Sequence, residues 1–491
     1  MVIFSKTLQR NLVAVFAPFG AMLMLGSLTM LPPIGIELLY KDGSITPFLH
    51  SFWFMLISGF IIWFPLRHTV LEIQNRQGVV VVVSVWITVC VMSALPFVLA
   101  DQPQMSLIDA LFESTSGLTT TGATVLPKVD GLPHSILYYR AQLNLTGGIG
   151  IIVLAIAILP MIGIGGMQLY KAETPGPFKD EKLTPRIRET AKRLSSIYLI
   201  LIVICAWAFW IAGMNLFDAV THSFATLALG GFSTHTDSLG YFNSPTIELV
   251  AAFFSLLAGV NFGLIYVAWY RKSLWPILRD SEFQFYIGVM AILTGIVCIG
   301  LYTSKTFPLW EAIYHGIFQT ASTVTDNGLA AGNYPNWPPF LALLLIMGSF
   351  FGGSVGSTCG GIKAMRFLLL AKQSFHEIRL LIHPHGRFFV KLGNRPISER
   401  AMQTVWGFYF LYVFIYCIFS LAVTATGVDI ITAFGSVAGC LNNMGLGYGA
   451  TASNFGGLNT FAKWLLIFAM LLGRLELFPV LMLCTPAYWR A

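Results

Sequence analysis

The sequence predicts an all-α membrane protein in which two N-terminal helices precede four parallel helix–pore loop–helix repeats around one ion pore. Three observations lead to this prediction. The first is composition: 56% of the 491 residues are hydrophobic and 10% are charged, with a mean hydropathy of +0.73, whereas about 25% of the residues in a soluble domain are charged. The second is a series of long apolar runs. The third is a glycine-containing pattern that recurs four times.

The apolar runs are long enough to cross about 30 Å of hydrocarbon, for which a helix needs about 20 residues. We expect ten spans, and therefore both termini on one side of the membrane. They cover residues 12–34, 47–65, 79–100, 136–165, 195–214, 246–270, 284–303, 337–370, 402–426 and 461–485. The first span lacks a convincing cleavage site, so we interpret it as a retained helix and not as a signal peptide.

Lysine and arginine residues set the expected orientation. With the N-terminus inside, the interior loops are 67–76, 171–193, 271–279 and 372–400, and these hold most of the 29 basic residues. This agrees with the positive-inside rule and places both termini in the cytoplasm. Basic loops also explain the net charge of +7, so no nucleic-acid binding is inferred. The seven cysteines show no metal-binding or disulfide spacing.

The recurring pattern is a short half-apolar segment followed by a glycine thirteen residues after the segment begins. The four pairs are Asp109 and Gly122, Asp218 and Gly231, His315 and Gly328, and Thr432 and Gly445. A single loop of this kind is more often a tight turn between two spans. Four copies in the same context favour re-entrant loops that surround one pore.

These copies divide the chain into five predicted parts. The parts are two N-terminal transmembrane helices (1–77), pore repeat 1 (78–190), pore repeat 2 (191–280), pore repeat 3 with a gating loop (281–400) and pore repeat 4 (401–491).

The chain that returns from each half-helix is predicted to form a cation filter. A helix of about 12 residues is roughly 18 Å long and reaches halfway across the membrane, and non-helical chain at that depth must line water or protein. Glycine lets carbonyl groups turn towards an axis, where they replace the hydration shell of a monovalent cation. The predicted filter residues are Thr120, Thr121, Gly122, Leu229, Gly230, Gly231, Asp326, Asn327, Gly328, Asn443, Met444 and Gly445.

A glycine-rich stretch at 352–361 interrupts the eighth span. Each glycine destabilises a helix by about 1 kcal/mol relative to alanine, so we expect a movable loop that faces a cavity under the filter. Close helix packing through small residues is the alternative. The predicted gate residues are Gly352, Gly353, Gly356, Gly360, Gly361 and Arg474.

Arg474 lies inside the last predicted span, where an arginine costs at least about 2.5–3.5 kcal/mol. It faces the pore as a barrier to cations, or it pairs with the carbonyls of the 352–361 loop, and both can hold in different states. Glu476 follows two residues later and lies on a different face. Lys363 and Arg366 are expected to extend to the interior interface.

Catalytic motifs in their proper context are absent from the sequence. H-E-x-x-H does not occur, and the G-x-S-x-G match at residues 352–356 lies within an apolar span and not at a strand-to-helix turn, so we do not expect an enzyme. The stretch from Gly356 to Lys363 misses the spacing of a phosphate-binding loop, so nucleotide binding by this chain is not expected either.

Six segments carry a resemblance to a known family. They are residues 112–124 (with Leu118-Thr119-Thr120-Thr121-Gly122), 147–154 (Gly147-Gly148-Ile149-Gly150), 165–170, 230–235 (Gly230-Gly231-Phe232-Ser233-Thr234-His235), 356–358 and 473–476. The chain resembles the Trk/Ktr/HKT potassium-transporter superfamily nearly end to end, and within it the Trk-type subunit with two additional N-terminal helices.

The resemblance implies K⁺ uptake through a central pore in the bacterial inner membrane. It also implies a homodimer and a cytosolic ring of RCK/KTN-type (TrkA-like) nucleotide-binding regulatory subunits. The basic segments 171–193 and 372–400 are candidates for docking that ring, although anionic membrane lipid would hold them equally well. The alternative is a symporter that couples K⁺ to H⁺ or Na⁺, but such transporters normally have inverted repeats with carboxylates at the midplane.

The third loop departs from the family pattern. Asp326 and Asn327 stand where most relatives have small hydroxyl residues. Either the Asp326 carboxylate lines the cation path, or it points away and caps neighbouring N–H groups, as Asp often does in turns. The second interpretation is favoured, and the departure leaves the strictness of K⁺ over Na⁺ selection open.

Overall fold

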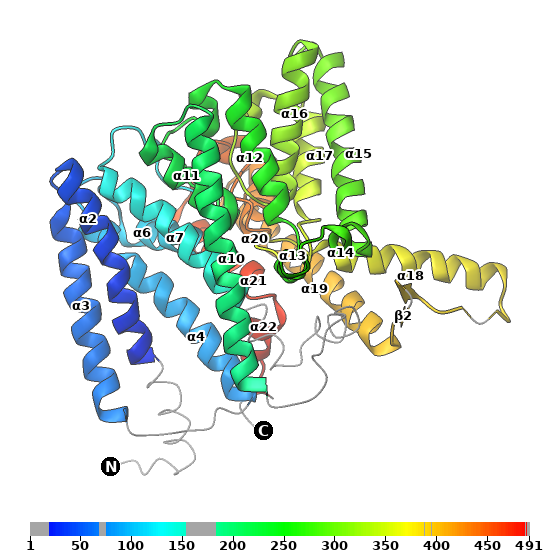
Figure 1. Cartoon of the computed structure of the whole chain (residues 1–491), viewed down its shortest axis with the longest axis horizontal. Coiled ribbons are helices and arrows are strands. Elements are labelled where there is room, and N and C mark those ends of the chain that lie inside the picture. Colours follow the sequence, from blue (N-terminus) through cyan, green and yellow to red (C-terminus); the bar gives the residue numbers. More distant parts are fainter. Residues whose placement is uncertain are drawn as a thin grey trace.

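The computed structural model describes residues 19–67, 75–153, 183–386, 388–393, 395–486 and 488. This part of the chain is almost entirely helical, with one two-stranded antiparallel sheet of β1 (Lys391–Leu392) and β2 (Arg395–Pro396). The predicted fold class is confirmed: an N-terminal helix pair is followed by four helix–half-helix–helix units (Figure 1).

The N-terminal pair consists of an apolar segment at Phe19–Tyr40 and helix α3 (Ile45–Trp63). The first includes η1 (Leu28–Met30) and α2 (Leu31–Tyr40), and η2 (Phe64–Leu66) follows the second. The pair packs on repeat 1, where Gln142 donates a 2.6 Å hydrogen bond to the carbonyl of Thr29.

The four units share one order of elements. Repeat 1 contains α4 (Asn75–Ser93), α5 (Leu95–Leu99), half-helix α6 (Leu107–Leu118) and α7 (His134–Val153). Repeat 2 contains α10 (Leu183–Ile211), half-helix α11 (Leu216–Ala228), η4 (Ser238–Phe242), α12 (Pro245–Ala258), α13 (Phe262–Arg271) and α14 (Trp275–Leu278). Repeat 3 contains α15 (Ser281–Thr303), half-helix α16 (Leu309–Val324), η5 (Tyr334–Asn336), α17 (Pro339–Ser349) and α18 (Ala364–Ile382). Repeat 4 contains α19 (Glu399–Thr424), half-helix α20 (Ile430–Leu441), η6 (Gly449–Thr451), α21 (Thr460–Arg474) and α22 (Phe478–Leu483).

Side-chain caps begin three of the half-helices. Ser106, Asn215 and Asp429 each accept a hydrogen bond from the backbone N–H three residues later, which satisfies a donor that the first helical turn leaves free. The third half-helix differs, because α16 begins after Pro308 and is about a turn longer. The prediction that it begins at His315 is therefore wrong, since the proline fixes the earlier start.

Three expected spans are not continuous helices. The 246–270 span bends by 93° between α12 and α13, and the 337–370 and 461–485 spans divide into α17 and α18 and into α21 and α22. Among the described residues, six helices are long and apolar enough to cross a membrane, or seven with the bent pair. The expected 136–165 span is described only to Val153, and the 165–170 motif lies outside the described residues.

The bend between α12 and α13 has a local cause. Asn261 caps α13 by accepting a 2.7 Å hydrogen bond from the N–H of Gly263. The 352–361 loop supplies partners for the groups that the break exposes: Ser354 donates to the carbonyl of Gly259, and Phe262 donates to the carbonyl of Gly356. Backbone groups freed at membrane depth need such partners, so the two broken helices support each other.

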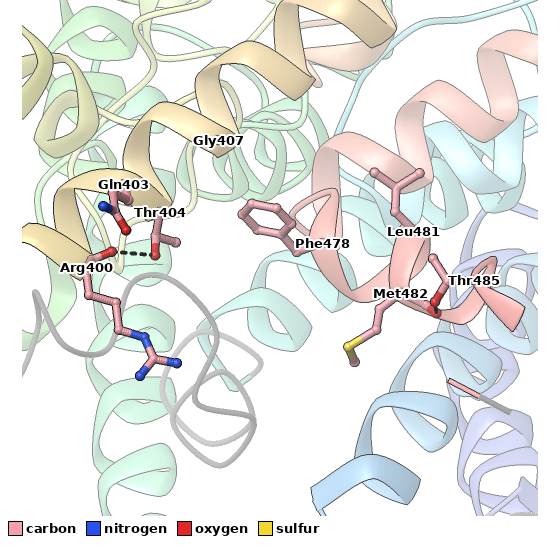
Figure 2. A pocket seen from close by; sticks show the side chains of 8 residues that line it. All are labelled: Arg400, Gln403, Thr404, Gly407, Phe478, Leu481, Met482 and Thr485. Carbon is pink, nitrogen blue, oxygen red and sulfur yellow. Dashed lines mark hydrogen bonds between the residues drawn. The ribbon is translucent and has the colours of Figure 1, made fainter. Parts of the chain in front are cut away.

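The break after α21 leaves a groove of about 710 Å³ between α19 and α22 (Figure 2). Its lining residues are Arg400, Gln403, Thr404, Gly407, Phe478, Leu481, Met482 and Thr485. Phe478 points across this groove towards α19. Helix α18 projects from the bundle together with β2 (Figure 1) and exposes large apolar side chains, including Phe375 and Leu381.

Glycine allows α21 to approach the end of half-helix α20 closely. A methyl group on Gly473 would lie 2.0 Å from the carbonyl oxygen of Leu441. We expect Gly473→Ala to lower the free energy of unfolding by about 1–3 kcal/mol, as overpacking of a core does. Gly457 has open space around it, so Gly457→Ala is the control. Thermal unfolding in detergent would compare the two, and equal melting temperatures would contradict the close contact.

Candidate functional site

The four predicted filter glycines form a closed ring. A methyl group on Gly122 would lie 2.5 Å from the carbonyl oxygen of Gly230 in repeat 2. A methyl group on Gly231 would lie 2.5 Å from the carbonyl oxygen of Asn327, and one on Gly328 would lie 2.1 Å from the carbonyl oxygen of Met444. Gly445 closes the ring, with its added methyl 2.1 Å from the carbonyl of Thr121. Each glycine therefore borders the backbone of the next repeat, and no side chain fits there.

The half-helices reach this ring through the same backbone motif. The residue two positions before each glycine has positive φ: 48° at Thr120, 53° at Leu229, 63° at Asp326 and 57° at Asn443. Its N–H bonds to the carbonyl three residues earlier, and the next N–H bonds to the carbonyl five residues earlier. This is the Schellman pattern that ends a helix. This helix ending was not predicted, because none of these four residues is glycine.

The ring leaves carbonyl oxygens without protein partners. The carbonyls of the four positive-φ residues and of the four glycines accept no hydrogen bond from any described residue. Among the carbonyls between them, that of Gly230 accepts bonds from Phe232 and from Asn144. The predicted filter residues that have side chains are all buried. Buried carbonyls normally have partners, so this set is suited to a bound cation.

A cavity of about 620 Å³ opens over the ring on the side where the half-helices begin, which we call the outer side. All four filter glycines line it, together with residues such as Arg140, His235, Glu248 and His315. Ions can therefore meet the glycine ring from this cavity without crossing the apolar core.

Polar contacts tie neighbouring repeats together around this cavity. Lys463 of repeat 4 contacts Asp109 of repeat 1 at 2.6 Å, and His315 of repeat 3 contacts Glu248 of repeat 2 at 2.8 Å. Two of the four residues that lie thirteen positions before the glycines, Asp109 and His315, thus contribute to inter-repeat contacts. Between repeats 3 and 4, Asn442 donates to Ser349 at 2.7 Å.

Repeats 1 and 2 are joined by a buried arginine. Arg140 of α7 pairs with Glu113 of α6 at 2.8 Å and donates to the carbonyl of Ser233. Glu113 also accepts bonds from Thr124 and from the N–H of Val125, so the pair fixes both return segments. A buried charge pair with additional hydrogen bonds was not predicted, because its members lie 27 residues apart on separate helices.

His235 forms a second contact between repeats 1 and 2. Its Nδ1 lies 3.2 Å from Asp130 and its Nε2 lies 3.1 Å from Asp218, while its ring stacks on Tyr241. Burial alone would lower the pKa of His235, but the hydrogen bonds and charges of Asp218 and Asp130 raise it above the usual value. Two carboxylates facing both ring nitrogens favour the doubly protonated imidazolium.

The predicted gating loop lies directly against the chain that leads into the predicted filter. Gly361 donates to the carbonyl of Asn442 at 3.1 Å, and a methyl group on Gly360 would lie 1.8 Å from that same oxygen. Thr358 donates to the carbonyl of Leu227 at the end of α11. Gly352, Gly356 and Gly361 have φ values of 63°, 78° and 65°, which favour glycine. Gly353 borders Cys359 and the carbonyl of Gly259.

Arg474 connects a predicted filter residue to this loop. One guanidinium nitrogen donates to the hydroxyl of Thr120 at 2.5 Å and to the carbonyl of Thr358 at 3.0 Å. Arg474 thus pairs with a loop carbonyl, which is one of the two expected arrangements. It is also the last residue of α21, so it does not lie within a continuous span as expected.

Two expectations for charged side chains are wrong. Asp326 does not cap neighbouring N–H groups, because both carboxylate oxygens are buried without a described hydrogen-bond partner. Arg366 does not extend to the interface. It is buried, pairs with Glu476 at 2.7 Å and stacks on Phe408, because the break after α21 turns Glu476 towards it.

The fold and site define a polytopic membrane protein of the cation-transport class, with four repeats around one pathway. The chain belongs to the TrkH family, described as cation transport proteins, whose model matches residues 44–490.

Named relatives agree with this assignment. The Trk system potassium uptake protein TrkH of Escherichia coli is 47% identical, with 96% of this chain and 98% of the relative covered. The protein TrkG of the same organism is 45% identical, with 96% and 97% covered. The crystal structure of the potassium transporter TrkH from Vibrio parahaemolyticus aligns with a TM-score of 0.90 at 42% identity, covering 98% of this chain and all of that one.

The contacts of His235 predict a pH-dependent contribution to stability. A raised folded-state pKa stabilises the protein fully below the unfolded value of about 6.5, and this contribution is lost as pH rises through the folded pKa. We expect His235→Gln to lower the melting temperature more at pH 6 than at pH 9. His50→Gln, at an exposed position of α3, is the control. A pH-independent difference between wild type and His235→Gln would contradict the proposed imidazolium.

Proposed function

We propose that this chain takes up K⁺ through a selectivity filter lined by the carbonyls of residues 120–122, 229–231, 326–328 and 443–445. The observation that carries the proposal is the closed glycine ring with unpartnered carbonyls. Relatives named as potassium uptake proteins support K⁺ as the transported ion. A K⁺ ion entering from the outer cavity would exchange water for carbonyl oxygens.

The half-helices contribute a second electrostatic effect. Their N-terminal ends lie at the outer side and their C-terminal ends meet at the ring. The negative ends of the four helix dipoles therefore converge where the ion would lie, which favours cations over anions. A coupled K⁺/H⁺ or K⁺/Na⁺ symporter is less well supported, because the four repeats are parallel and not inverted.

We propose that the 352–361 loop and Arg474 form the gate. The loop fills the space beneath the filter, and Arg474 places a positive charge beside Thr120. Release of the loop would require the Thr358 and Asn442 contacts to break. We further propose that cytosolic nucleotide-binding subunits drive this release and that the chain acts as a homodimer in the bacterial inner membrane. The exposed apolar residues on the projecting α18 support a docking role for that arm.

Substitution of the filter glycines tests the filter. Gly122→Ser, Gly231→Ser, Gly328→Ser or Gly445→Ser should weaken discrimination of K⁺ from Na⁺, because the added side chain meets the next repeat's carbonyl and strains a positive φ. The measurement is K⁺ and Na⁺ flux in proteoliposomes. Gly427 also has positive φ but open space around it, so Gly427→Ser is the matched control. Unchanged selectivity in all four filter variants would remove the assignment.

Loss of the gate contacts should open the path. We expect Arg474→Ala, or removal of residues 353–360, to raise basal K⁺ flux without any partner subunit, because the first removes a repulsive charge and the second removes a steric block. Flux is measured in proteoliposomes that contain only this chain. If both variants insert and fold but conduct no more than wild type, the gate lies elsewhere.

A further inference from the structure

We propose that the carboxylate of Asp326 forms an inner cation site at the junction of the filter and the gating loop. This inference rests on the proposed function and adds a side-chain ligand to the backbone filter. It concerns a charged group that only repeat 3 carries, since the equivalent positions hold Thr120, Leu229 and Asn443.

The Asp326 carboxylate is buried without compensating hydrogen bonds from the part of the chain that the structure describes. The side chain of Asp326 is fully buried, and neither carboxylate oxygen has a hydrogen-bond partner among the described residues. A buried polar group without partners is strongly destabilising, and an ionised carboxylate more so. An intramembrane carboxylate with this property is a functional-site hypothesis by default.

Asp326 belongs to the repeat opposite the one that Arg474 contacts. The ring order places repeats 1 and 3 on opposite sides of the pathway, because repeat 1 borders repeats 2 and 4. Arg474 binds Thr120 on the repeat 1 side, so Asp326 occupies the equivalent place opposite. Neither carboxylate oxygen of Asp326 has a hydrogen-bond partner among the described residues. A cation leaving the filter would pass between the two opposite charges.

The Asp326 carboxylate also borders the 352–361 loop. A methyl group on Gly361 would lie 3.3 Å from Oδ2 of Asp326, and one on Gly352 would lie 3.5 Å away. Both loop glycines therefore border the carboxylate, and a side chain at either would cover it. Movement of the loop would uncover Asp326 towards the interior.

The chemistry points to a monovalent cation as the ligand. Asp326 is one of the four positive-φ residues whose carbonyls have no described partner, so it brings a carboxylate to a set of oxygen ligands, and oxygen ligands suit hard cations. Rings of carboxylates serve the same purpose in other cation pores. Because the pathway is proposed to carry K⁺, the site would hold K⁺ after it leaves the glycine ring.

Asp326→Asn tests the proposal with little structural change, because Asn443 already occupies the equivalent position with the same backbone conformation. The half-saturating K⁺ concentration for flux in proteoliposomes should rise about tenfold or more. Loss of the attraction between opposite charges about 4 Å apart is expected to weaken ion binding by more than a factor of about ten. The ratio of K⁺ to Na⁺ flux should stay at the wild-type value, because the glycine ring is intact. K⁺-dependent thermal stabilisation in detergent should weaken in parallel.

Asp101→Asn removes the same charge at an exposed position and is the matched control. Asp326→Thr, which copies the residue of repeat 1, replaces the Asn variant if that protein aggregates. Equal half-saturation in wild type and Asp326→Asn, or an equal rise in Asp101→Asn, would overturn the inner site. Failure of the wild-type chain to carry K⁺ would instead overturn the proposed function, so the two failures are distinct.

Discussion

The structure depends on the missing side chain at four glycines. A carbonyl oxygen of the next repeat occupies the position that a Cβ atom would need at each of Gly122, Gly231, Gly328 and Gly445. The same contact recurs from each repeat to the next around the ring. The four repeats must therefore keep one cyclic order, with their glycines at nearly the same level along the ring axis. The contacts between Asp109 and Lys463, and between His315 and Glu248, hold that order at the outer rim. The fold can therefore be regarded as a support for four carbonyl-lined turns.

The ends of the half-helices explain why those carbonyls remain available. In a Schellman ending the last helical carbonyls receive the N–H groups of the following residues, and the chain leaves in a new direction. The positive φ at Thr120 and Leu229 carries strain of about 1–3 kcal/mol per residue. Hydrogen bonds between neighbouring segments help to offset this strain. Asn443 donates to Thr121 at 3.0 Å, and Asn327 donates to Ser255 at 2.7 Å.

Much of this architecture follows from the sequence, because the repeat spacing and the apolar runs are local signals. The bend before α13 had such a signal in Gly259 and Asn261, and Pro308 marked the early start of α16. The positive φ at Thr120 and Leu229 had none, since Thr and Leu disfavour that conformation and the compensating contacts come from other repeats. The burial of Arg366 depends on Glu476, 110 residues later, and no local pattern predicts such a pair.

The proposed filter and the proposed gate form one hydrogen-bonded unit, and this limits how the 352–361 loop can move. Gly361 donates to Asn442 beside the filter, and Arg474 bonds to both Thr120 and Thr358. A net contribution of about 1 kcal/mol for a neutral hydrogen bond and about 1.5–3 kcal/mol for a charged one amounts to a few kcal/mol for the contacts that hold the loop. Reversing a two-state population from 1:99 to 99:1 needs about 5.5 kcal/mol. A partner that binds the open state preferentially by that amount would suffice, and the filter residues bonded to the loop would lose those contacts in the same step.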